Sequence, residues 1–193
     1  LIGGSGRDVI DGAAGDDALL GGTDRDELTG GDGDDYVQGN AGNDTLSGGG
    51  GRNMLLGGAG DDRLNGSTGP DLIYGQNGAD RIHSYAGDDV IDGGNQVDHI
   101  WSGDGNDYVT GGASNDYIYG EAGNDTLSGG ADADGLWGGS GDDRLLGGAG
   151  NDLMRGDDGN DTIYGDADAD SIWGGLGDDG VEGGAGADLI DGE

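Results

Sequence analysis

Aspartate recurs at every ninth residue from Asp8 to Asp188, and only Asn53 interrupts the series. Carboxylates are hard oxygen ligands, so a long series of them at one spacing suits a divalent cation such as calcium or magnesium. The chain has no cysteine and only two histidines, which leaves sites for softer metals without ligands. The candidate chemistry is therefore cation binding by a repeated carboxylate.

The aspartates occupy the sixth position of a nine-residue repeat that runs in unbroken register from Gly3 to Asp191 in 21 copies. One copy, Gly147 to Arg155, reads Gly-Gly-Ala-Gly-Asn-Asp-Leu-Met-Arg. Position eight is aliphatic in all 21 copies, and position one is glycine in 19. The repeat predicts these metal ligands: Asp8, Asp17, Asp26, Asp35, Asp44, Asp62, Asp71, Asp80, Asp89, Asp98, Asp107, Asp116, Asp125, Asp134, Asp143, Asp152, Asp161, Asp170, Asp179 and Asp188.

The overall charge agrees with a cation-binding role. The net charge is −34, from 41 acidic residues against seven arginines and no lysine. Such a surface repels phosphate backbones and anionic lipid, which argues against nucleic-acid and membrane-surface partners. No apolar run approaches the roughly 20 residues that cross a bilayer, so membrane insertion is not expected.

The repeat also predicts the elements that position the carboxylates. Glycines at positions one and four can take the positive φ of a tight turn, and positions seven to nine read as a short strand with position eight inward. Two nonamers close one 18-residue coil. The fold expected is all-β, a parallel β-roll (β-solenoid) of about ten coils, roughly 50 Å long at about 4.8 Å per coil. We interpret residues 1–193 as one such domain, cut at both ends from a longer array.

Stacked coils would place the position-six carboxylates about 4.8 Å apart in two rows. Like charges at that distance oppose folding unless a cation lies between them. Calcium suits a flexible ring of turn carbonyls better than magnesium, which requires stricter octahedral geometry. If each ion bridges repeat n to repeat n+2, the 21 repeats allow up to about 19 calcium ions. We therefore expect the chain to be largely unfolded without calcium.

The pattern Gly-Gly-x-Gly-x-Asp-x-aliphatic-x resembles the RTX, or hemolysin-type, calcium-binding repeats, and the resemblance covers essentially the whole chain. It implies a right-handed parallel β-roll with calcium between successive turns, bound by position-six carboxylates and turn carbonyls. It also implies a non-enzymatic module of a secreted bacterial protein, exported by the type I route and folded outside the cell.

The two edges of the coil are not equivalent in sequence. All departures from glycine at position four fall in odd-numbered repeats, and we expect less regular calcium binding there near Gln96 and Ser114. In the even-numbered repeats the weak point is Asn53, which lacks the charge. Ordinary drift in a redundant array is the alternative explanation.

Position nine of the odd-numbered repeats carries His83 and then an aromatic row of Trp101, Tyr119, Trp137 and Trp173. An exposed aromatic strip marks a binding surface for a glycan, a neighbouring domain or another copy of the chain. The alternative is cross-strand stacking that stabilises the sheet.

Other functions therefore stay open beside a calcium-folded spacer. The chain could be an adhesive, surface-layer or self-assembling segment that uses the aromatic face, or the non-catalytic module of a secreted enzyme or toxin. Ice binding is disfavoured because threonines form no regular row on the turns.

Overall fold

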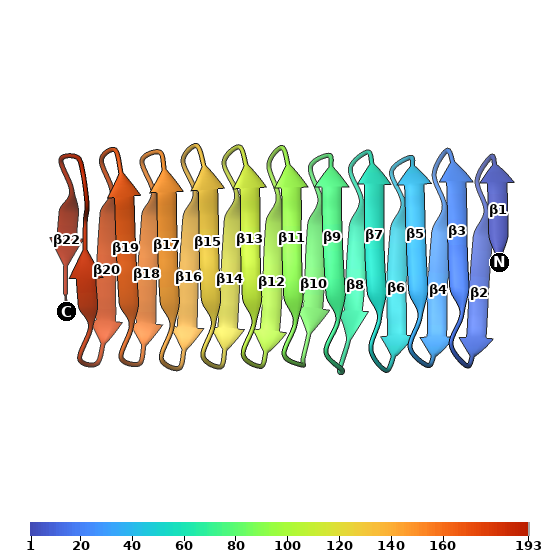
Figure 1. Cartoon of the computed structure of the whole chain (residues 1–193), viewed down its shortest axis with the longest axis horizontal. Helices are drawn as coiled ribbons and strands as arrows, with labels where there is room; N and C mark the ends of the chain where they lie inside the picture. Colours follow the sequence, from blue (N-terminus) through green and yellow to red (C-terminus); the bar gives the residue numbers. More distant parts are fainter. Residues whose placement is uncertain (193) are drawn as a thin grey trace.

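The computed structural model describes residues 1–192 and contains two parallel sheets of eleven strands each (Figure 1). The odd-strand sheet comprises β1 (Ile2–Ser5), β3 (Ala18–Thr23), β5 (Tyr36–Ala41), β7 (Met54–Ala59), β9 (Leu72–Asn77), β11 (Val90–Asn95), β13 (Tyr108–Ala113), β15 (Thr126–Ala131), β17 (Arg144–Ala149), β19 (Thr162–Ala167) and β21 (Gly180–Glu182). The even-strand sheet comprises β2 (Val9–Ala14), β4 (Glu27–Asp32), β6 (Thr45–Gly50), β8 (Arg63–Ser67), β10 (Arg81–Tyr85), β12 (His99–Asp104), β14 (Tyr117–Ala122), β16 (Gly135–Ser140), β18 (Leu153–Asp158), β20 (Ser171–Leu176) and β22 (Leu189–Asp191).

Successive strands alternate between the two sheets, and each strand pairs in parallel with the strand two places along the chain. The register is one coil: Ile91 lies beside Val109, and Ile100 beside Ile118. The expected parallel β-roll with 18 residues per coil is therefore confirmed. Turns that follow odd strands form one long edge, at the top of Figure 1, and turns that follow even strands form the other.

The strands are longer than the sequence predicted. We expected three residues, positions seven to nine, whereas most strands have six because positions one to three of the next repeat continue the ladder. In β11 the buried residues are Ile91 and Gly93, at positions eight and one. The in-and-out alternation of a strand thus begins at the aspartate of position six and continues past the aliphatic residue to the glycine.

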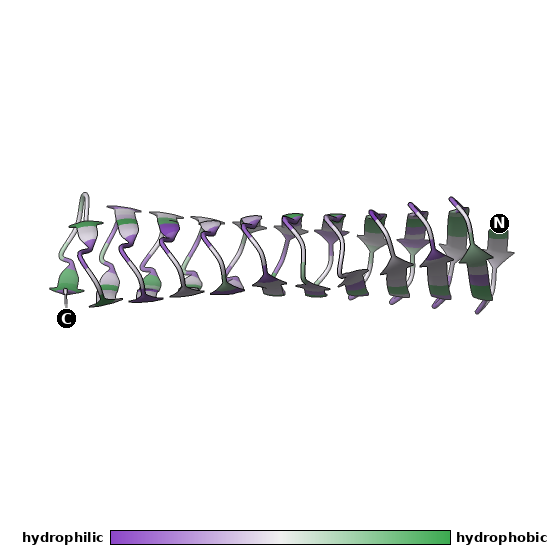
Figure 2. Ribbon diagram, turned by 90° about the horizontal axis from the view of Figure 1, so that it is seen from below, coloured by the Kyte–Doolittle hydropathy of each residue, from purple (hydrophilic) through white to green (hydrophobic). Residues whose placement is uncertain are grey.

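The core is a double row of position-eight side chains enclosed between the two sheets. Those from Leu19 to Ile172 are all at most 1% exposed. Ile10 and Val181 are only partly buried, and Ile190 is 48% exposed, because the end coils have a neighbour on one side only. Figure 2 shows the two layers edge-on, with much of the hydrophilic colouring on the loops that join them.

Among the residues that the structure describes, none forms a helix long and apolar enough to cross a membrane.

Candidate metal centre

The position-six residues form two rows, one along each edge of the roll. The Asp8 row contains the position-six residues of odd-numbered repeats, and the Asp17 row those of even-numbered repeats. Along both rows each side-chain Oδ1 accepts a hydrogen bond from the backbone N–H of the row member 18 residues earlier, as Asp116 Oδ1 does from Asp98 at 2.8 Å. The structure thus brings the predicted ligands together in rows, and the ladder of coils sets the orientation of each carboxylate.

The second oxygen of these carboxylates has no partner. Oδ2 is buried without a hydrogen bond in Asp8, Asp26, Asp35, Asp44, Asp62, Asp71, Asp80, Asp89, Asp98, Asp107, Asp116, Asp125, Asp134, Asp143, Asp152, Asp161, Asp170 and Asp179. An unpaired buried polar atom costs about 1–3 kcal/mol, and more when it carries charge. So many of them at one position of a repeat indicate a ligand that the polypeptide does not itself supply.

The glycine at position one leaves the space into which this oxygen points. A Cβ on Gly111 would lie 2.6 Å from Asp116 Oδ2 and 2.8 Å from the carbonyl oxygen of Gly129, one coil further on. Gly21 and Gly147 show the same arrangement with their own aspartates. A carboxylate oxygen and a main-chain carbonyl oxygen therefore border one small space in successive coils.

The backbone conformation at position one differs from the one that the sequence predicted. Position four takes positive φ, as predicted, but position one does not; the second residue with positive φ is at position two. Position two accepts Asn40, Tyr85 and Glu121 at φ of 74–77°, whereas position one departs from glycine only at Ser84 and Ser102. Position one is therefore restricted by the space beside the carboxylate and not by backbone conformation.

Burial makes the charged form of these carboxylates unfavourable. Desolvation raises the pKa of Asp98 to about 8 and that of Asp62 to about 7, although a backbone N–H bond to each acts in the opposite direction. Neighbours in the row raise both pKa values further, Asp44 and Asp80 acting on Asp62. The pKa of Asp116, Asp125, Asp134 and Asp143 also rises to about 7, and that of Asp80, Asp89 and Asp152 to about 6, with burial as the main cause.

The donor set suits calcium. Within residues 1–192, no three acidic or histidine side chains converge on one point, so carboxylates alone do not complete a site. The remaining oxygens available beside each Oδ2 are main-chain carbonyls of the glycine-rich strands and turns. Mixed carboxylate and carbonyl oxygens in a flexible ring are the ligands that calcium accepts most readily.

Asn53 belongs to the Asp17 row, and both polar atoms of its side chain form hydrogen bonds. Its Oδ1 accepts the N–H of Asp35 at 3.1 Å, and its Nδ2 donates to Asp71 Oδ1 at 3.1 Å. In the next coil, Ser67 Oγ donates to the carbonyl oxygen of Gly51 at 2.9 Å. The amide of Asn53 thus bonds Asp71 Oδ1, whereas Asp71 Oδ2 stays buried without a partner, and a weaker calcium site at Asn53 stays a prediction.

The turn that leads to Asp71, one coil after Asn53 in the Asp17 row, differs from the other turns in its backbone conformation. The sequence analysis did not predict this difference. Neither Ser67 nor Gly69 takes the positive φ found at the same positions elsewhere in the described repeats. The signal was present in the chain's single proline, because Pro70 restricts Gly69 to extended backbone.

The predicted irregularity at Gln96 and Ser114 has no counterpart in the backbone. Their φ values, 76° and 87°, keep the left-handed conformation of the glycines they replace. Asp98 and Asp116, which follow them, are fully buried and keep the row hydrogen bond. A lower calcium affinity at this place stays a prediction.

The aromatic residues form a stack on the outer face of the even-strand sheet. We call His83, Trp101, Tyr119 and Trp137 the aromatic ladder; successive ring centroids lie 4.3, 5.6 and 4.5 Å apart and successive rings are within 10° of parallel. The rings therefore cover one another's faces, as cross-strand stacking requires. Trp173 lies two coils beyond Trp137, with Arg155 on the strand between them.

Comparison with protein families supports the metal assignment. The family described as RTX calcium-binding nonapeptide repeat (4 copies) matches the chain in overlapping segments, residues 1–28, 20–55, 29–64, 56–91, 65–100, 74–109, 101–136, 119–154, 137–172, 146–181 and 155–190. A search of curated proteins finds no match.

Proposed function

Because the chain belongs to the family of RTX calcium-binding nonapeptide repeats, we propose that it is a calcium-dependent folding module of a secreted bacterial protein, with the position-six carboxylates of both rows as ligands. The supporting observation is the repeated, buried and partnerless Oδ2. Calcium would supply the positive charge that these oxygens lack. The chain would supply carboxylate oxygens, whose orientation the row hydrogen bonds fix, and carbonyl oxygens beside position one.

The same observation supports a switch between two states of the chain. At neutral pH the metal-free fold must either bury ionised carboxylates in rows or hold them protonated, and both choices cost free energy. Extracellular modules bind calcium with dissociation constants of about 0.1–1 mM. We infer that the chain stays unfolded in calcium-poor cytosol and folds outside the cell, where it acts as a spacer coupled to secretion.

The number of ions follows from the rows. One ion for each pair of neighbours within a row gives up to about 19. We propose that no ion binds between Asn53 and Asp71. An amide replaces one of the two carboxylates there, and it donates a hydrogen bond to Asp71 Oδ1. Calcium binding in the Asp17 row would then be interrupted at this rung.

A calcium titration followed by circular dichroism tests the proposal. We expect little sheet signal at pH 7.5 in excess chelator, full signal in millimolar calcium, and a weaker response to magnesium. Full sheet signal in chelator would refute the switch.

Asp61 and Asp62 offer a matched pair of substitutions for the ligand assignment. Asp62→Asn removes a buried row carboxylate, and we expect fewer calcium ions per chain in native mass spectrometry. Asp61→Asn makes the same chemical change at an exposed residue whose Oδ1 accepts only the Ala79 N–H, a role that an amide oxygen can also fill. Equal stoichiometry in the two variants would contradict the ligand assignment.

The alternative, an adhesive or self-assembling segment, would need the aromatic residues as a binding platform. The ring faces of the ladder are largely covered by one another, which favours the stabilising role for Trp101, Tyr119 and Trp137. A role as the non-catalytic module of a secreted enzyme or toxin is compatible with the calcium switch.

A further inference from the structure

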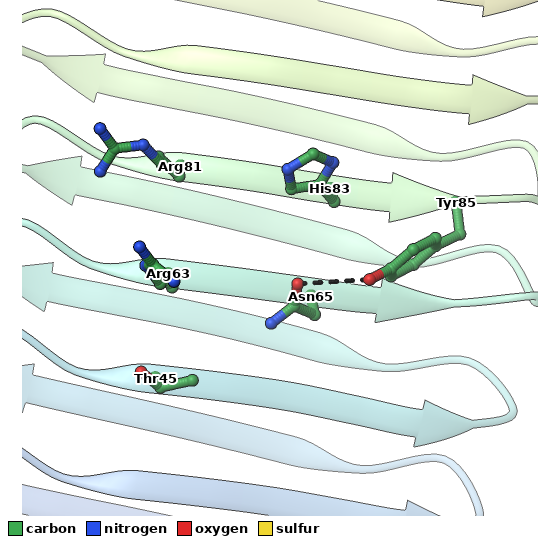
Figure 3. A pocket seen from close by; sticks show the side chains of 6 residues that line it. All are labelled: Thr45, Arg63, Asn65, Arg81, His83 and Tyr85. Atoms are coloured by element: carbon green, nitrogen blue, oxygen red, sulfur yellow. Dashed lines mark hydrogen bonds between the residues drawn. The ribbon is translucent and has the colours of Figure 1, made fainter.

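At the His83 end of the aromatic ladder, the outer face of the even-strand sheet contains a hollow of about 470 Å³. Side chains from β6, β8 and β10 line it: Thr45, Arg63, Asn65, Arg81, His83 and Tyr85 (Figure 3). They present two guanidinium groups, an imidazole, an amide and two hydroxyls. No carboxylate lines this hollow, although the chain carries a net charge of −34.

Two of the seven arginines of the chain lie side by side here. Arg63 and Arg81 are register partners on neighbouring strands, one coil apart, and Figure 3 shows their guanidinium groups on the same side of the hollow. Within the described part of the chain, neither arginine forms an ion pair and both are exposed, although Asp44 and Asp61 border the adjoining hollow that the two arginines also line. Adjacent like charges on a sheet repel each other, and an anion between them would turn that repulsion into binding.

The chemistry of the lining suits an oxyanion. Guanidinium groups present planar pairs of N–H donors that match the oxygens of a carboxylate or sulfate. Asn65 and Thr45 add neutral polar groups to the lining, and the Tyr85 hydroxyl donates a hydrogen bond to Asn65 Oδ1 at 3.5 Å. An oxyanion at the arginines would thus find further hydrogen-bonding groups within the same hollow.

His83 supplies a flat wall. One face of its ring stacks on Trp101, with centroids 4.3 Å apart and planes within 2°, while the ring also borders the hollow. Burial lowers the pKa of His83, so the ring is neutral at pH 7 and serves as a stacking surface. Trp101, which stacks in turn on Tyr119, and Tyr85 on the same strand lie against this ring.

We propose that this hollow is a binding site for a carboxylate or sulfate group carried on a ring, with Arg63 and Arg81 holding the oxyanion and His83 packing against the ring. The site lies on the outer face of a sheet, whereas the calcium ligands lie along the edges of the roll. The site therefore differs from the calcium sites in charge and faces a different side of the roll, although Arg63 and Arg81 directly follow the row residues Asp62 and Asp80 in the chain.

Calorimetric titration of the calcium-loaded chain tests the proposal, with circular dichroism confirming the fold in the same sample. The probes are sodium sulfate, 4-nitrophenyl sulfate and glucose 6-sulfate. We expect either ring-bearing sulfate to bind at least about tenfold more tightly than sulfate alone, the size of effect that one additional good contact of about 1.4 kcal/mol produces. Equal affinity for all three probes would refute the role of the ring, and no heat from any probe would refute the site.

Two kinds of variant separate the site from a general charge effect. Arg63→Gln and Arg81→Gln should each weaken 4-nitrophenyl sulfate about tenfold, and His83→Ala should abolish the advantage over free sulfate. Arg144→Gln is the matched control, because Arg144 lies on β17 in the other sheet and packs over the Tyr164 ring at 4.8 Å. An equal loss in Arg144→Gln would show that net charge alone governs binding and would overturn the proposal.

Discussion

Protons should substitute for calcium as the agent that allows the chain to fold. Burial raises the pKa of Asp98 to about 8 and that of Asp62 to about 7, from ordinary values near 3.8. Each tenfold change in an acid dissociation constant corresponds to about 1.4 kcal/mol, so ionising Asp62 in the metal-free fold costs on the order of 4 kcal/mol. Several such carboxyls together exceed the roughly 5–15 kcal/mol by which a typical domain is stable.

The direction of the pH dependence follows from these raised pKa values. The folded-state pKa lies above the unfolded value, so the stabilising contribution of each carboxyl is complete below pH 3.8 and is lost as the pH rises through about 6 to 8. A protonated Oδ2 can also donate a hydrogen bond, and a carbonyl oxygen of the next coil borders the same space. Acid therefore removes the charge and supplies a donor at once.

The assay is far-ultraviolet circular dichroism of the calcium-free chain from pH 8 to pH 3.5. We expect no sheet signal at pH 8 and a sheet signal at pH 4. With saturating calcium the dependence should reverse, since protons compete with the metal for the same oxygens and the apparent calcium affinity falls in acid. A calcium-free chain that is folded at pH 8, or that shows no sheet at pH 4, would refute the charge argument.

Three further predictions, the first with a control substitution, follow from the geometry. Gly111→Ala places a Cβ 2.6 Å from Asp116 Oδ2 and should remove calcium from that rung in native mass spectrometry, whereas Gly50→Ala, with its nearest contact at 3.7 Å, should bind the wild-type number of ions. Asn53→Asp should add one calcium ion per chain and raise the calcium concentration needed for folding; an unchanged count would contradict the interrupted row. Ile100→Ala should destabilise the calcium-loaded roll by about 2–5 kcal/mol in a denaturant titration, because its side chain is fully buried, and a loss below about 1 kcal/mol would contradict a close-packed core.

The nine-residue period was sufficient to predict the roll, because each aspartate and each aliphatic residue returns to one place in every second repeat. The same period predicted the two carboxylate rows, whereas a weaker calcium site at Asn53, inferred from its missing charge, stays a prediction. Strand length was underestimated because the glycines of positions one and two and the mostly small or polar residues of position three read as turn, whereas parallel neighbours on both sides hold such residues in extended pairing. The turn propensity of these residues is outweighed by their pairing with the neighbouring strands.

The restriction of position one to glycine could not be predicted from local sequence. Its cause is an oxygen five residues ahead and a carbonyl 18 residues away, as Gly111 shows with Asp116 and Gly129. Only the closed coil brings these atoms together. The sequence did contain one signal. Position two accepts Tyr85 and Glu121, although the backbone takes positive φ there, so positive φ alone does not require glycine.

The coils should load calcium from the middle of the roll outward. Each row carboxylate is oriented by an N–H of the preceding coil, so a ligand is in place only where its neighbouring coil is already folded. The interior coils have a fully buried aliphatic residue on every strand, whereas Ile190 is 48% exposed at the C-terminal end. A coil without a neighbour loses both hydrophobic burial and an oriented ligand, so the end coils are the weakest in metal binding as well as in folding. We therefore expect coil folding and metal binding to be one coupled process along the roll, as in repeat proteins whose stability depends on contacts between neighbours.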